Sequence, residues 1–236
     1  MVYEVLPVVP KKDKASVACT AVPGDMRAVR VVGRFGILEL LSLVWAKPGM
    51  NVELHRLQAQ ENTCRLGRTA SFQWGSASDR GRVRPENEDA LFVEPEIGLF
   101  LVSDGMGGHR GGALASKLVT EDLPVLIENA LHELRSASPR AIRAVFKRSI
   151  AEQSRQLWME GISESGYKDM GATLAAVLLQ NHRAYIANLG DSRIYRLRKG
   201  RLVQLSKDHS VVSELLREGT IAPAEAANHT AQGEST

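Results

Sequence analysis

Cysteine and aromatic residues are scarce in this chain of 236 residues. Cys19 and Cys64 are the two cysteines, and Phe, Trp and Tyr together make up 5% of the sequence. Two isolated cysteines without metal-type spacing exclude a disulfide framework or a zinc knuckle, and they favour a reducing compartment, the cytoplasm. The low aromatic content leaves little scope for stacking on nucleic-acid bases.

Long apolar runs and a strong net charge are also missing. No stretch approaches the roughly 18 apolar residues of a membrane span, so we expect none. Near the N-terminus the positive charges follow the apolar residues, which is the reverse of a secretory leader. The net charge is +3, and residues 1–70 hold ten Lys and Arg against six Asp and Glu. A basicity this small is typical of a solvated surface, so we expect no nucleic-acid partner.

Residues 1–70 are interpreted as a basic extension without an assigned function. Apolar residues recur at helical spacing from Ile37 to Val44 and are followed by Pro48. This pattern predicts one amphipathic helix. The polar residues 55–71 resemble a linker to the next segment.

Residues 71–236 have the pattern of a compact mixed domain. Short apolar runs predict strands, Lys199 and Gly200 predict a hairpin turn, and two longer segments predict helices. One helix has Ser138 as its N-cap and Pro139 at its first position, and the other is expected to kink or break at Pro124. Strands followed by two helices and further strands indicate a layered α+β domain. The expected strands cover 90–94, 98–103, 172–179, 183–188 and 192–206, and the expected helices 114–131 and 138–161.

Asp104 is the first candidate for a chemical role. It follows the apolar run 99–102 and precedes a glycine-rich segment. Glycine permits tight turns and leaves backbone carbonyls uncovered. Carboxylate and carbonyl oxygens suit hard cations such as Mg²⁺ and Mn²⁺. The alternative is that Asp104 caps the helix that follows.

A second acidic cluster lies before the preceding strand. Arg84, Glu88 and Asp89 stand close together there. The arginine either neutralises these carboxylates or binds an anionic substrate, and its planar donor pair suits phosphate. Adjacent residues on an extended chain face opposite sides, so Glu88 and Asp89 need not reach the same ion. Asp169 again precedes an apolar run, whereas Asp191 lies in a turn and is interpreted as structural.

Several motifs in one order carry a family resemblance. From Phe72 to His229 the chain resembles the metal-dependent Ser/Thr phosphatase family, the PPM or type 2C phosphatases, and its bacterial members in particular. The resemblance implies two mainly antiparallel sheets in a β-sandwich, with helices on both outer faces. The matching stretches are "RVRPENEDA", "VSDGMGGHRGG", "DMGATLAAV", "IANLGDSRIYRLRKGRLVQLSKDHS" and "LLREGTIAPAEAANH".

The resemblance also implies roles for individual residues. Asp104 matches the acid that bridges two Mn²⁺ or Mg²⁺ ions, Gly105 supplies a carbonyl ligand, and Glu88 and Asp89 match the acidic pair at the same centre. Asp169 corresponds to the acid that helps to hold a weaker third ion. Arg84 matches the phosphate-binding arginine, and His109 the position proposed for proton donation to the leaving oxygen, although a solvated histidine is the alternative there. The implied reaction is hydrolysis of phosphoserine and phosphothreonine in proteins by a metal-activated water. We expect the chain to be a monomer.

The chain departs from the family pattern at its C-terminal end. Relatives continue beyond "EAANH" into a second "SDG" motif and an Asp-Asn pair, whereas this sequence ends at "TAQGEST". We therefore expect an incomplete sandwich and weaker cation binding. One alternative function is a catalytically impaired module that binds phosphoproteins or other partners. A nucleotide-binding loop at 105–112 is a weaker alternative, because no Gly-Lys-Ser/Thr follows it.

Overall fold

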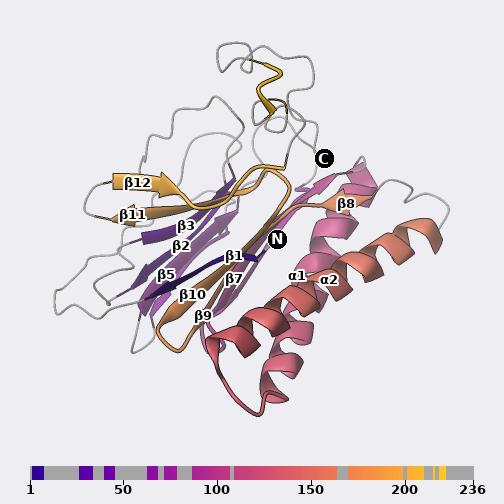
Figure 1. Ribbon diagram of the computed structural model, residues 1–236. Coiled ribbons are helices and arrows are strands. Elements are labelled where there is room, and N and C mark those ends of the chain that lie inside the picture. The colour runs from indigo at the N-terminus through magenta and orange to yellow at the C-terminus, as the bar shows by residue number, and fades with distance from the viewer. Residues whose placement is uncertain are drawn as a thin grey trace.

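The computed structural model contains two β-sheets and two long helices (Figure 1). The structure describes residues 2–7, 27–33, 40–45, 63–68, 72–78, 87–106, 109–163, 170–198, 201–209, 215 and 218–221. Pairing in both sheets is antiparallel throughout. This architecture confirms the predicted α+β class with an antiparallel sandwich.

The first sheet has the strand order β1-β10-β9-β7-β6, and the short strand β8 pairs with β7 beyond the end of β9. The interior strand β7 is apolar over 99–102 and buried, as the sequence predicts. A run without polar alternation is typical of a strand covered on both faces. The strands are β1 Val2–Pro7, β6 Asp89–Glu94, β7 Leu99–Met106, β8 Gly171–Ala172, β9 Leu174–Gln180 and β10 Arg183–Leu189.

The second sheet has the strand order β12-β11-β3-β2-β5-β4. Strands β11 and β12 form the expected hairpin, because Arg198 pairs with Arg201 across residues 199 and 200. The strands are β2 Arg27–Gly33, β3 Leu40–Trp45, β4 Thr63–Arg68, β5 Phe72–Ser78, β11 Arg193–Arg198 and β12 Arg201–Gln204.

Two expectations for the first 70 residues differ from the structure. Residues 40–45 form strand β3, which pairs with β2 on one side and β11 on the other, and not the expected helix. A short apolar run fits both the helical and the strand period of apolar residues. Pairing with a neighbouring strand on both sides favours the strand. Residues 63–68, expected in a linker, form strand β4 on β5. The division of the chain at residue 71 stays a prediction.

Helix α1 spans His109–His132 and helix α2 spans Pro139–Ser163. The expected N-cap is confirmed, because the Ala141 amide donates to the Ser138 hydroxyl at 3.3 Å. The expected break at Pro124 is wrong, since α1 continues through it. Proline in a helix interior costs about 3 kcal/mol. Burial of Leu123 and Ile127, both fully inaccessible to solvent, offsets that cost.

Two apolar clusters lie on opposite faces of the first sheet. The cluster under the helices includes Leu99 and Leu101, and the cluster facing the second sheet includes Phe100 and Val102. Successive residues of β7 thus alternate between the two faces. Both long helices contact strands of this sheet (Figure 1), and a helix on the outer face of the second sheet is not among the described elements. Among the described residues, no helix is long and apolar enough to cross a membrane.

Candidate metal centre

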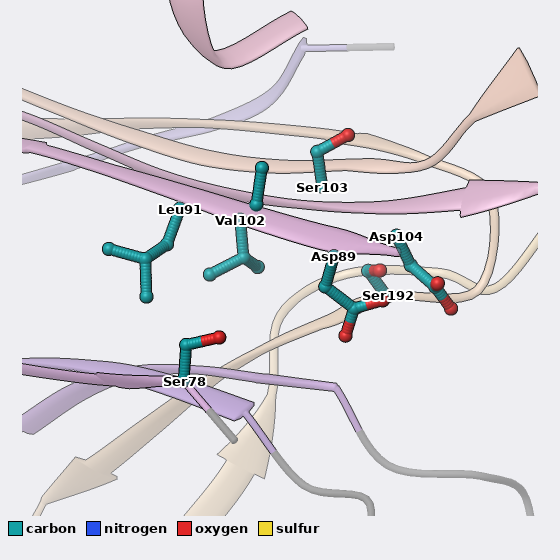
Figure 2. Close-up of a pocket in the computed structure, with 8 residues that line it drawn as sticks. Ser78, Asp89, Leu91, Val102, Ser103, Asp104 and Ser192 are labelled. Carbon is teal, nitrogen blue, oxygen red and sulfur yellow. The ribbon is translucent and has the colours of Figure 1, made fainter. Parts of the chain in front are cut away.

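Asp89 and Asp104 are direct cross-strand partners in the pairing of β6 with β7. Strand alternation gives Asp104 the same face as Val102, and Asp89 the same face as Leu91. That is the face turned toward the second sheet. Figure 2 shows both carboxylates at the end of the two strands, on the same side of the sheet and close to Ser192. The structure therefore brings together two carboxylates that lie in separate sequence motifs.

A pocket opens beside this pair of acids. Like charges directly opposite each other on neighbouring strands destabilise a sheet, and a cation between them reverses the sign of that interaction. The oxygen groups at the pocket are hard ligands of the kind that Mg²⁺ and Mn²⁺ prefer. The pocket is lined by Ser78, Asp89, Ala90, Leu91, Val102, Ser103, Asp104 and Ser192.

Gly105 and Glu88 contribute through their backbones. The Gly105 amide donates to the Glu88 carbonyl at 3.1 Å, and the Ser116 hydroxyl donates to the same oxygen at 2.5 Å. A Cβ added at Gly105 would lie 1.9 Å from the Gly112 carbonyl oxygen. Only glycine therefore lets the start of α1 approach the end of β7 this closely. Glu88 does not line the pocket, in agreement with the expectation that neighbouring acids face opposite sides.

Asp191 lies near this centre, which the sequence interpretation as a structural turn residue did not anticipate. Burial raises the pKa of this carboxyl, and the negative charges of Asp104 and Asp208 raise it further. Its own backbone hydrogen bond and the Arg193 guanidinium act in the opposite direction. The charge of Asp191 and that of Asp104 are thus close enough to interact. The signal available in the sequence is an acid at the end of an apolar run and next to a glycine, which precedes Asp191 and follows Asp104.

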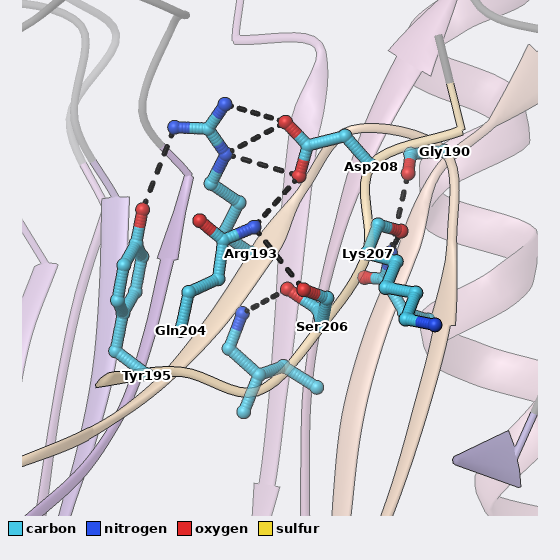
Figure 3. Close-up of polar contacts among 9 residues, drawn as sticks. Gly190, Arg193, Tyr195, Gln204, Ser206, Lys207 and Asp208 are labelled. Atoms are coloured by element: carbon cyan, nitrogen blue, oxygen red, sulfur yellow. Dashed lines mark hydrogen bonds and ion pairs between the residues drawn. The ribbon is translucent and has the colours of Figure 1, made fainter. Parts of the chain in front are cut away.

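Hydrogen bonds and an ion pair hold the turn that carries Asp191, together with the start of β11, against residues 206–209 (Figure 3). Arg193 binds the Asp208 carboxylate through Nε and Nη2, with Nε to Oδ2 at 2.9 Å. The Asn188 side chain donates to the carbonyls of Gly190 and Lys207. His209 donates its amide to the Gly190 carbonyl and accepts the Gly190 amide at Nδ1. His209 therefore helps to hold the turn.

Three of the predicted site residues are not placed by the structure. Arg84 and Asp169 lie outside the described residues, and only the backbone of His109, the first residue of α1, is described. Within the described part of the chain, no group of three or more His, Cys, Asp or Glu side chains forms a metal-binding cluster. Mg²⁺ commonly keeps several waters and binds through one or two carboxylates, so the pair of Asp89 and Asp104 fits such an ion.

A two-sheet sandwich with two opposed carboxylates beside a pocket forms a candidate site for a divalent cation. The family model "Protein phosphatase 2C" matches residues 82–235. The chain belongs to the protein phosphatase 2C family. This confirms the resemblance inferred from the motifs.

Relatives of known name are similar over the same part of the chain. The serine/threonine phosphatase stp of Listeria welshimeri is 38% identical over 156 residues, which are 64% of this chain and 60% of that protein. The serine/threonine protein phosphatase PstP of Mycobacterium tuberculosis is 36% identical over 162 residues, 68% of this chain and 30% of that protein. The chain therefore spans less than two thirds of the length of these relatives.

Solved structures show the same fold. The crystal structure of the Mycobacterium tuberculosis phosphatase PstP/Ppp superposes with a TM-score of 0.58 at 30% identity, and the match covers 75% of this chain and 66% of that one. Serine/threonine phosphatase Stp1 from Staphylococcus aureus gives a TM-score of 0.58 at 29% identity, with coverages of 80% and 68%. The arrangement of sheets and helices is that of the phosphatase family.

Asp191→Asn should raise the melting temperature of the metal-free protein at pH 7 and weaken Mn²⁺ binding. Because folding raises the pKa of this carboxyl, the folded protein holds the proton more tightly than the unfolded chain. The resulting loss of stability grows as the pH rises from the unfolded pKa through the folded pKa. The asparagine side chain carries no charge, so the variant does not undergo this loss of stability. Thermal unfolding in EDTA measures the change in melting temperature. The melting temperatures of the two proteins should converge when the pH falls below the unfolded pKa.

A lower melting temperature for the variant at pH 7 would contradict the electrostatic account of Asp191. The effect on Mn²⁺ follows from the loss of a negative charge near Asp104. Electron paramagnetic resonance of free Mn²⁺ measures it without any substrate.

Proposed function

We propose that this chain hydrolyses phosphoserine and phosphothreonine in proteins, with Mn²⁺ or Mg²⁺ as its cofactor. The observation that carries the proposal is the direct opposition of Asp89 and Asp104 at the pocket. Two anionic groups held face to face at a strand end are costly without a cation and suited to one. Membership of the protein phosphatase 2C family supports the phosphoester as the bond that is cleaved. Because the chain spans 60% of the Listeria relative, the activity is proposed for this chain and not carried over from the relative.

The proposed division of labour follows the chemistry of each side chain. Asp89 and Asp104 hold the cation, and the Gly105 carbonyl is a further ligand. A bound divalent cation would lower the pKa of a water molecule, so that hydroxide is available at neutral pH to attack phosphorus. Arg84 binds two oxygens of the phosphoryl group through its planar donor pair.

The remaining assignments are proposed on the motifs alone. Glu88 completes the acidic pair, Asp169 helps to hold a weaker third ion, and His109 donates a proton to the leaving oxygen. The substrates are phosphorylated proteins. We further propose that the chain acts in the cytoplasm, on the basis of its two isolated cysteines, and that it acts as a monomer.

Hydrolysis of a phosphothreonine peptide by the full 236-residue chain tests the proposal. Phosphate release is measured against Mn²⁺ concentration, with EDTA and Ca²⁺ as controls. We expect turnover that saturates with Mn²⁺ and stops in EDTA. Binding of the phosphopeptide without turnover at any Mn²⁺ concentration would replace the proposal with the non-catalytic binding module. Absence of both binding and turnover would overturn both functions.

A further inference from the structure

Thr173 interrupts the ladder beside Asp104. It lies between β8 and β9, at the register position opposite Asp104, and belongs to neither strand. Its amide donates to the Asp104 carbonyl at 2.8 Å, as in a regular antiparallel pair. The return bond is different, because the Asp104 amide donates to the Thr173 hydroxyl at 3.0 Å. The side chain thus occupies the place that its own carbonyl takes in a regular ladder.

The displaced carbonyl of Thr173 is not left without a partner. It accepts the Ser103 hydroxyl at 2.7 Å. The Thr173 hydroxyl lies 2.6 Å from that of Ser192, a hydrogen bond in which either oxygen can be the donor. The side chains of Thr173, Ser103 and Ser192 are all buried. A buried polar network in which each hydroxyl is satisfied fixes one arrangement of the groups attached to it.

The methyl group of Thr173 has a separate contact. Gly190 adopts a φ of +83°, and a Cβ added there would lie 2.7 Å from Thr173 Cγ2. The turn 190–192 therefore packs on the methyl while Ser192 bonds to the hydroxyl. Through these two contacts the turn that carries Asp191 is attached to the strand end that carries Asp104. Burial raises the pKa of Asp191, and nearby charges that include Asp104 raise it further. This effect is consistent with Asp191 and Asp104 lying near each other.

We propose that Thr173 is a positioning residue whose hydroxyl, with that of Ser192, fixes Asp104 and the Asp191 turn in the arrangement that binds a divalent cation. Thr173 touches neither substrate nor cation in this role. It holds the backbone of a ligand residue on one side and the neighbouring acidic turn on the other. The inference rests on the proposed function only in taking Asp104 as a cation ligand.

The experiment measures Mn²⁺ binding and stability separately on the full chain. Free Mn²⁺ is followed by electron paramagnetic resonance, and thermal unfolding is recorded in EDTA. Thr173→Val removes the hydroxyl and keeps the shape, whereas Thr173→Ser keeps the hydroxyl and removes the methyl. Loss of an outer-shell partner typically costs about 10–100-fold in metal affinity, and we expect Thr173→Val to fall in that range. Thr173→Ser should keep most of the Mn²⁺ affinity of the original chain, because the hydroxyl is retained, while its melting temperature drops.

Ser192→Ala is a second test of the hydroxyl network, and Ser149→Ala is its matched control. Both serines are buried, but the Ser149 hydroxyl bonds the Leu126 carbonyl between the helices, far from Asp104 in the fold. We expect Ser192→Ala to weaken Mn²⁺ binding several-fold and Ser149→Ala to lower only stability. If Thr173→Val does not fold, the serine variants and Thr173→Ser decide the question.

Each outcome separates the inference from the proposed function. An original chain that does not bind Mn²⁺ overturns the proposed function and the inference together. An original chain that binds Mn²⁺, with Thr173→Val and Ser192→Ala at the same affinity, overturns the inference alone. Equal losses of affinity in Thr173→Val and Thr173→Ser would also overturn it, because the hydroxyl would then have no special part.

Discussion

Asp104→Asn should abolish Mn²⁺-dependent phosphoester hydrolysis while leaving the metal-free protein at least as stable as the original. The amide has nearly the same size, and the ladder bonds of Asp104 run through its backbone, so these backbone bonds are kept. The change removes one of two directly opposed negative charges. It also removes an anionic ligand. The loss of activity should therefore exceed the roughly 10–100-fold that an outer-shell change costs.

The measurement is the initial rate of phosphate release at increasing Mn²⁺, with the melting temperature in EDTA recorded beside it. Asp122→Asn, an equivalent substitution within α1, is the matched control and should leave both quantities unchanged. Turnover that persists in Asp104→Asn at the original Mn²⁺ dependence would remove Asp104 from the ligand set. A large drop in melting temperature would instead assign the carboxylate a structural part, such as the cap of α1.

The pairing of Asp89 with Asp104 was within reach of the sequence. Asp89 stands just before one apolar run, and Asp104 stands near the end of the next. The two runs have similar lengths and are joined by the short segment 95–98. A hairpin with that connection places one acid opposite the other, because register follows from the turn. The motifs then supplied the family, which the match over residues 82–235 confirms. The pattern of the two runs is therefore enough to place Asp89 opposite Asp104, whereas their role as cation ligands stays a prediction.

The parts that sequence reasoning missed depend on contacts between distant segments. Residues 40–45 became a strand because β2 and β11 supply partners on both sides, and local periodicity does not contain that information. Asp191 joined the site because its turn packs on Thr173, 17 to 19 residues earlier in the chain. Pro124 was tolerated because burial around it outweighs a local penalty. In each case tertiary packing overrode the local signal.

Arg193→Met should destabilise the chain by about 3–5 kcal/mol, the usual cost of leaving one partner of a buried ion pair alone. The side chains of Arg193 and Asp208 are 18% and 8% exposed. Burial by itself would lower the pKa of Arg193, but the hydrogen bonds and charge of Asp208 outweigh it and raise that pKa. Without the guanidinium, Asp208 keeps the Gln204 amide at 2.9 Å but loses the positive charge of Arg193. Urea unfolding of the full chain at pH 7 measures the loss.

A second substitution separates the ion pair from simple packing. Arg193→Met combined with Asp208→Leu removes the stranded charge, and a buried pair replaced by apolar residues is often nearly neutral in stability. We expect the double variant to recover most of the loss. Arg155→Met on the exposed face of α2, where Arg155 pairs with Glu152, is the matched control and should leave the unfolding free energy almost unchanged. Additive losses in the double variant would show that Arg193 acts through its aliphatic packing. The Asn188 and His209 hydrogen bonds would then hold residues 207–209 to the Asp191 turn.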